Sequence, residues 1–91
     1  MDSMAHQQFL RAVALHQQGK VLEAKPIYES IIKAYPNHAD ALNLLGLIAS
    51  QQGNAVEAIK LMNQSIEINP NEVGYLINLA NVLRSVNQLD A

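Results

Sequence analysis

The chain has 91 residues, of which 49% are hydrophobic and 15% charged, and its formal net charge is −2. This length accommodates one small domain, and the high apolar content excludes a disordered chain. The weak negative charge gives no electrostatic basis for binding nucleic acid or an anionic membrane, and the absence of cysteine excludes disulfides and thiolate metal sites.

Apolar residues recur every three or four positions in five segments, which predicts five helices and no strand. In chain order the expected helices are residues 4–18, 21–34, 38–52, 55–68 and 72–86. Gly53 is placed to end the third helix, Asn54 to cap the fourth and Pro70 to stop it. Pro26 lies just beyond the first turn of the second helix, where we expect a mild kink and no break. The chain is therefore predicted to be all-α.

The chain also repeats itself at an offset of 34 residues. Aligning 5–38 with 39–72 gives ten identical pairs: Ala5/Ala39, Leu10/Leu44, Gln17/Gln51, Gln18/Gln52, Gly19/Gly53, Glu23/Glu57, Ala24/Ala58, Ile32/Ile66, Pro36/Pro70 and Asn37/Asn71. A period of this size indicates a helical solenoid. We expect a single domain over 1–91, with repeat 1 at 5–38, repeat 2 at 39–72 and a partial repeat 3 at 73–91, as a fragment of a longer protein.

These units resemble tetratricopeptide repeats, which have the same period. The second unit carries the family pattern at Leu42, Leu45, Gly46, Ala49, Ala58, Met62 and Pro70. The resemblance implies about two and a half helix-turn-helix repeats in a right-handed superhelix, with the first helix of each repeat on the concave face. Small residues such as Gly46 would let paired helices approach closely. The expected core comprises Leu15, Ala24, Tyr28, Ile31, Leu45, Gly46, Ala58, Met62, Ile66 and Leu79.

The resemblance further implies protein or peptide binding along the first helices. The positions that would face the groove are apolar or amide-bearing with few charges, which suits an extended segment. They are His6, Phe9, Val13, His16 and Gln17 in the first unit, Asp40, Asn43, Leu47, Ser50 and Gln51 in the second, and Ile77, Asn78, Asn81 and Arg84 in the third.

No residue constellation predicts chemistry. His6 and His16 would lie about 15 Å apart along one helix, too far to share a metal, and His38 falls in a turn. No serine has a His–acid pair arranged as a triad, and the glycines are too dispersed to cradle phosphate. We therefore expect no enzyme activity from these residues, no cofactor and no metal.

The segment INLANVLR, residues 77–84, resembles a run in the repeats of O-linked N-acetylglucosamine transferases and their bacterial relatives. Asn78 and Asn81 match asparagines that hold peptide backbone in that family, whereas the second unit has Leu44 at the first of these positions. Two hypotheses stay open. The chain is a self-contained interaction module, or it is the substrate-recruiting N-terminal part of a larger enzyme, a glycosyltransferase.

The last expected helix carries an apolar stripe wider than one partner helix covers: Leu76, Leu79, Val82, Leu83 and Val86. We expect a homo-oligomer formed through 72–91, in which Leu79 and Leu83 support folding and assembly, and Val82 and Val86 mainly assembly. No apolar run is long enough to span a membrane, and the polar N-terminus has no signal-peptide pattern, so a cytoplasmic location is predicted.

Overall fold

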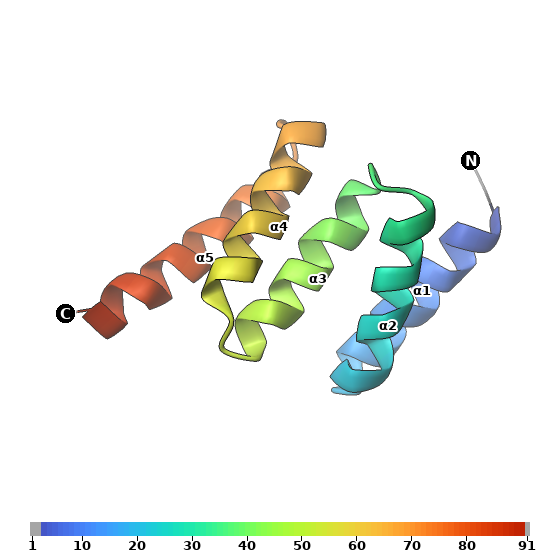
Figure 1. The fold of residues 1–91 in the computed structure, drawn as a ribbon, viewed down its shortest axis with the longest axis horizontal. Helices are drawn as coiled ribbons and strands as arrows, with labels where there is room; N and C mark the ends of the chain where they lie inside the picture. The colour runs from blue at the N-terminus through green and yellow to red at the C-terminus, as the bar shows by residue number, and fades with distance from the viewer. Residues whose placement is uncertain (1–2, 91) are drawn as a thin grey trace.

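The computed structural model describes the backbone of residues 3–90 and the side chains of 4–87. The five helices are α1 (Ser3–Gln17), α2 (Val21–Ala34), α3 (Ala39–Gln51), α4 (Ala55–Ile68) and α5 (Val73–Asp90), with no strand in the described range (Figure 1). The all-α prediction is confirmed, although residues 1, 2 and 91 of the predicted domain lie outside the described residues. Only α5 departs clearly from its expected bounds, because no glycine or proline after Gly74 stops it.

The helices follow one another across the molecule in chain order (Figure 1). The most extensive packing is within the pairs α3–α4 and α1–α2, and α2–α3 and α4–α5 join the pairs. The molecule measures 45 × 28 × 19 Å, so the array is elongated and thin. This is the stacked helix-pair arrangement of a solenoid. None of the described helices has both the length and the apolar character that crossing a bilayer requires.

The repeated glycine ends the first helix of each complete repeat. Gly19 and Gly53 have φ of +80° and +84°, a left-handed conformation that glycine adopts without a Cβ penalty. After α1, the Gly19 and Lys20 amides donate to His16 O and Leu15 O, at 3.0 and 2.9 Å. The same two bonds, 3.0 and 2.8 Å long, follow α3. Both ends are therefore Schellman motifs, which explains why the glycine recurs.

Side-chain caps are found at the starts of α3 and α4, and α2 contains the proline that the sequence places near its start. Asn54 Oδ1 accepts a hydrogen bond from the Glu57 amide at 3.2 Å, which confirms it as the cap of α4. His38 caps α3 in the same way, because its Nδ1 accepts from the Ala41 amide at 3.1 Å. α2 continues through Pro26 without a break.

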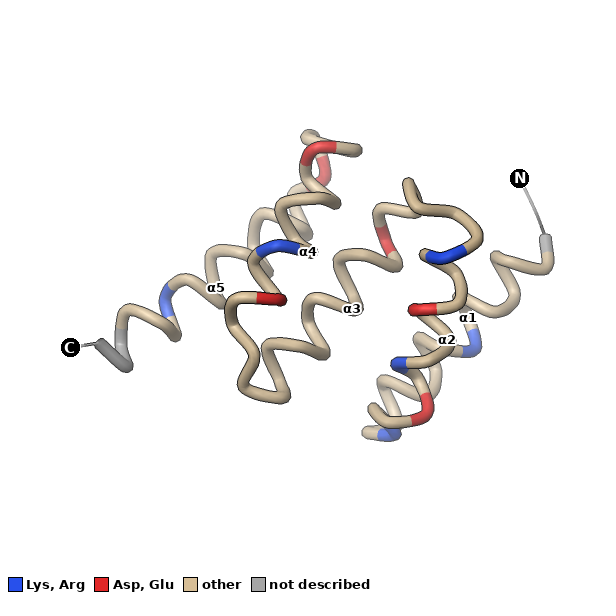
Figure 2. The backbone as a smooth tube through the Cα atoms, in the orientation of Figure 1, with Lys and Arg blue, Asp and Glu red and all other residues tan. Residues whose placement is uncertain are grey.

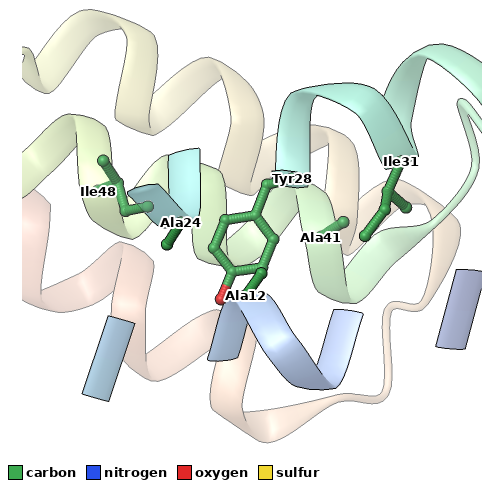
Figure 3. Close-up of a cluster of buried hydrophobic side chains, with 6 residues drawn as sticks. All are labelled: Ala12, Ala24, Tyr28, Ile31, Ala41 and Ile48. Carbon is green, nitrogen blue, oxygen red and sulfur yellow. The ribbon is translucent and has the colours of Figure 1, made fainter. Parts of the chain in front are cut away.

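Two clusters of buried side chains form the core, and each joins one helix pair to the first helix of the next repeat. The first contains Ala12, Ala24, Tyr28, Ile31, Ala41 and Ile48 (Figure 3), and the second contains Ala49, Ala58, Met62 and Val82. Most of the expected core is buried, but Leu15, Leu45, Ile66 and Leu79 are only half-buried. A thin array of helix pairs encloses few positions on all sides, so these leucines and the isoleucine keep one flank in solvent.

The close approach of α3 and α4 depends on Gly46. A Cβ at this position would lie 3.1 Å from Met62 Cγ, 3.2 Å from the Ala58 carbonyl oxygen and 3.3 Å from Leu61 Cβ. Such distances are shorter than ordinary van der Waals contact, so a Cβ fits here only if its neighbours on α4 move by a few tenths of an ångström. The expected role of Gly46 is confirmed.

The apolar residues of α5 that are buried are not the ones expected to be. Val82 is 4% exposed and packs with Ala49, Ala58 and Met62, whereas Leu83 is 44% exposed. The prediction that Val82 acts mainly in assembly is therefore wrong. The face of α5 that bears Val82 packs against the preceding repeat. The next residue along a helix is rotated by about 100° around the axis, so Leu83 lies on a different face.

Candidate peptide-binding surface

Side chains of successive first helices (α1, α3 and α5) bond to one another, and we call the surface that these helices form the first-helix face. The three bonds are His16 Nε2 to Gln51 Oε1 at 3.0 Å, Tyr75 hydroxyl to the Asp40 carboxylate, and Asn78 Nδ2 to Asn43 Oδ1 at 3.4 Å. Each joins residues 35 apart, one more than the repeat period of 34. The register between neighbouring first helices is thus offset by one residue.

The predicted groove residues differ in how far solvent reaches them. Exposed positions are His6, Gln17, Asp40, Gln51, Ile77, Asn81 and Arg84; half-buried ones are Phe9, Val13, His16, Leu47, Ser50 and Asn78. Asn43 is the exception, since it is 6% exposed and its amide oxygen accepts from Asn78. On α5, Arg84 Nη2 donates a hydrogen bond to Asn81 Oδ1 at 2.7 Å. The Asn81 side chain is exposed, and its NH2 group offers two hydrogen-bond donors to solvent or to a ligand.

Aromatic and imidazole rings pack together between α1, α2 and the start of α3. The Tyr28 ring lies 6.1 Å from Phe9 and 6.2 Å from His16, and Phe9 lies 5.1 Å from His38. The Tyr28 hydroxyl points toward Ala12 of α1 and has no hydrogen-bond partner among the described residues (Figure 3). Burial raises the pKa of Tyr28 from 10.0 to about 12, because the ionised form would lose its hydration.

A hollow of about 860 Å³ opens where the N-terminal ends of α1 and α3 meet the C-terminal ends of α2 and α4. We use the term hollow for the space lined by Ala5, His6 and Phe9 of α1, residues 34–40 of the α2–α3 corner, Ile68 and Asn69 at the end of α4, and Tyr75 of α5. It brings together three predicted groove residues, His6, Phe9 and Asp40. Its size is within the range of small-ligand pockets in proteins.

The sequence reasoning missed the aromatic contribution of Tyr35 and Tyr75 to the hollow. Both fall outside the repeat matches, since Tyr35 aligns with Asn69 and Tyr75 with Ala41. Two tyrosines near the expected repeat junctions were the available signal. Tyr75 is 4% exposed, and its pKa lies above the usual range because of burial first and the Asp40 hydrogen bond second.

Among the residues that line the hollow, the formally charged one is acidic. Asp40 is the lining residue with a formal negative charge, and no lysine or arginine is among the lining residues of this described region. Figure 2 shows acidic positions at the start of α3 and around the α4–α5 turn, along one edge of the array, and a basic position near the end of α2, whose last turn contains Lys33. In the described part of the chain, the hollow included, no three His, Cys, Asp or Glu side chains cluster as metal ligands do.

Antiparallel helix pairs stacked in one direction, with bonds between successive first helices, define an α-helical repeat protein of the solenoid class. A family model described as tetratricopeptide repeat matches residues 9–73. The chain belongs to the tetratricopeptide repeat family.

The chain is similar to three proteins that cover it to different extents. ER membrane protein complex subunit 2 of Dictyostelium discoideum is 34% identical over 61 residues, which are 67% of this chain and 19% of that protein. An O-GlcNAc transferase mutant of Thermobaculum terrenum matches with a TM-score of 0.87 and 28% identity, over 89% of this chain and 16% of the transferase. The MamA RS-1 ArsTM double mutant matches with a TM-score of 0.82 and 22% identity, over 91% of this chain and 47% of MamA.

Proposed function

We propose that this chain is a protein-interaction module that binds an extended peptide or partner segment along the first-helix face. Tetratricopeptide repeats generally mediate protein interactions, and repeat solenoids use their concave surfaces for binding. The observation that carries the proposal is the row of amide and imidazole side chains on α1, α3 and α5. Hydrogen bonds between these side chains link each first helix to the next and hold the row in place. Such groups match the alternating donors and acceptors of an extended backbone.

The exposed amides of Gln51 and Asn81 give the sharpest test. Asn43 is unsuitable because it is buried, so its replacement would disturb packing as well as binding. A random peptide library displayed on phage and selected against the chain provides the probe. We expect Gln51→Ala and Asn81→Ala each to weaken the selected peptide about five- to tenfold, since each removes about 1 kcal/mol of hydrogen bonding.

Fluorescence polarisation of the labelled peptide measures these affinities. Lys60→Ala and Gln64→Ala are the matched controls, because both side chains are exposed on α4, a second helix. We expect them to change the affinity less than twofold. Unchanged binding by the first pair together with weak binding by the second would place the interaction on the outer helices.

A second candidate function is that these repeats recruit substrates for a larger enzyme, a glycosyltransferase. The structural similarity to the Thermobaculum O-GlcNAc transferase favours it, and this chain matches 16% of that protein. The transferase-like Asn78 and Asn81 both lie on α5, at half-buried and exposed positions. The length of the natural open reading frame distinguishes the two candidates.

The cytoplasmic location and the exclusion of nucleic acid stay predictions.

Self-association through 72–91 is part of the proposal. Leu76, Ile77 and Leu83 are 45%, 54% and 44% exposed on α5, and Leu76 and Leu83 are seven positions apart, two helical turns along one face. We expect light scattering across a dilution series to show dimers or larger species at high micromolar concentration. The double variant Leu76→Ser and Leu83→Ser should be monomeric there and keep its fold.

The control for self-association uses apolar side chains exposed elsewhere. Leu22 on α2 and Val56 on α4 are 79% and 81% exposed, so Leu22→Ser and Val56→Ser remove similar apolar surface without touching α5. These variants should associate as the unaltered chain does. A monomer of the unaltered chain at high micromolar concentration would refute this part of the proposal.

A further inference from the structure

We propose that the hollow selects the partner by taking one of its arginine side chains, which pairs with Asp40 and stacks on the surrounding rings. This inference rests on the proposed function, because it names the residue of the bound protein segment that the module recognises. It concerns one end of the first-helix face, where His6, Phe9 and Asp40 meet the α2–α3 corner. Gln51 is not among the residues that line the hollow.

The walls of the hollow suit a flat cation. Phe9 is half-buried and its ring lies 5.1 Å from that of His38, so both are held in place by packing. Tyr35, at the α2–α3 corner, is 41% exposed, and Tyr75 closes the space from α5. A guanidinium group is planar and weakly hydrated, and it stacks on aromatic faces more readily than an ammonium group.

The carboxylate at this site is fixed in orientation. Asp40 lies in the first turn of α3, and one of its oxygens accepts a hydrogen bond from the Tyr75 hydroxyl. A carboxylate offers two oxygens with about four acceptor positions, so this bond leaves capacity for a forked guanidinium pair. Since Tyr75 is buried, it fixes the carboxylate before any ligand arrives.

Charge favours a cationic ligand over the alternatives. The lining residues include Asp40 and neither lysine nor arginine. Outside the lining, Glu72 acts on the Tyr75 hydroxyl and Lys33 lies in the last turn of α2. Asp40 is therefore the charge that a ligand in the hollow meets directly. An acidic side chain in the hollow would be repelled, and a purely apolar one would remove water from Asp40 without replacing its hydrogen bonds. An alternative explanation is that Asp40 only stabilises the N-terminus of α3 through the helix dipole. That explanation does not account for the aromatic rings that line the hollow beside it.

Four short peptides test the proposal on the full chain: acetyl-Gly-Ala-X-Ala-Gly-amide, where X is arginine, citrulline, lysine or glutamate. Citrulline keeps the shape of arginine and removes its charge. Each peptide is titrated to millimolar concentration while backbone amide NMR shifts of the ¹⁵N-labelled chain are recorded. We expect saturable shifts at Asn37, Ala39, Asp40 and Asn69, with arginine binding about fivefold tighter than citrulline. Lysine should bind less tightly than arginine, and glutamate least.

Variants of the chain assign the preference to Asp40. In Asp40→Asn the arginine and citrulline peptides should bind equally, whereas Glu23→Gln, an exposed carboxylate change at the start of α2, should keep the fivefold preference. Tyr35→Ala should weaken the arginine peptide by removing a stacking wall. It tests the site independently if Asp40→Asn fails to fold.

The outcomes separate this inference from the proposed function. Equal binding of arginine and citrulline by the unaltered chain, or shifts located away from the hollow, would overturn the arginine site. If the phage-selected peptide still weakens with Gln51→Ala in that case, the proposed function stands alone. An arginine preference that disappears in Asp40→Asn supports the inference, whether or not Gln51→Ala affects the longer peptide.

Discussion

Gly46→Leu is expected to destabilise the protein by about 3 kcal/mol, at the upper end of the overpacking range. The space for a Cβ at this position is bounded by the Ala58 carbonyl oxygen at 3.2 Å and by Leu61 Cβ at 3.3 Å, atoms of α4 that move only if the helix moves. Overpacking of this kind costs about 1–3 kcal/mol for a few added carbons, and a leucine adds four. A domain of this size has about 5–14 kcal/mol of stability in total.

Thermal unfolding followed by circular dichroism measures this loss. We expect Gly46→Leu to lower Tm by more than about 15 °C, and Gly46→Ala by less, because both place a Cβ against the same atoms but leucine adds three further carbons. Packing must also outweigh the gain of up to about 1 kcal/mol that alanine brings to a helix interior.

Gly74→Ala is the matched control, since it makes the same change in another first helix. A Cβ there would meet only Glu72 Oε1, at an ordinary 3.6 Å, and Gly74 lies in the first turn of α5. The helix propensity gain then acts without a clash, so this variant should be as stable as the original chain or slightly more stable. A Gly46→Ala protein that matched it would show that α3 and α4 do not approach closely.

Local chemistry made much of the fold predictable from the sequence. Gly19 and Gly53 end helices because only glycine adopts their positive φ without strain, and Asn54 caps α4 through its own side chain. These signals depend on residues within one turn of the chain. They therefore appear in the sequence without knowledge of what packs where, and the helix bounds near them were predicted to within a residue.

Features that depend on the partner helix were less predictable. The spacing of Val82 and Leu83 fits an apolar stripe equally well, and only the position of α4 decides that Val82 is buried. Asn43 was expected to face a groove, but the one-residue offset between first helices brings Asn78 against it. The hollow likewise depends on Tyr75, which the offset places beside Asp40 and which no repeat match indicates.

Tyr28→Phe is expected to stabilise the protein, and to do so more strongly in alkali. The side chain is fully buried, and its hydroxyl has no hydrogen-bond partner in the described part of the chain. A buried polar group without a partner costs about 1–3 kcal/mol, partly offset here by the small space that the missing oxygen leaves. Urea unfolding at pH 7 should therefore show a gain of about 1 kcal/mol for the variant.

The pH dependence follows from the raised pKa of Tyr28, about 12 in the folded protein against 10.0 for the free side chain. Below pH 10 the hydroxyl is protonated in both states, and its ionisation does not affect stability. Between pH 10 and 12 the unfolded chain loses this proton while the folded protein retains it, so the unaltered chain loses stability as pH rises. At pH 11 the advantage of Tyr28→Phe should have grown by about 1.4 kcal/mol.

The comparison with Tyr35→Phe isolates the effect of burial. Tyr35 is 41% exposed, so we expect this variant to remain within about 0.5 kcal/mol of the original chain at pH 7. Because Tyr75 also has a raised pKa and titrates in alkali, only the difference between Tyr28→Phe and the unaltered chain at each pH is informative. A Tyr28→Phe protein that was less stable at pH 7 would mean that the hydroxyl makes a favourable contact inside the core, for example a weak bond to a neighbouring aromatic ring such as Phe9 or His16.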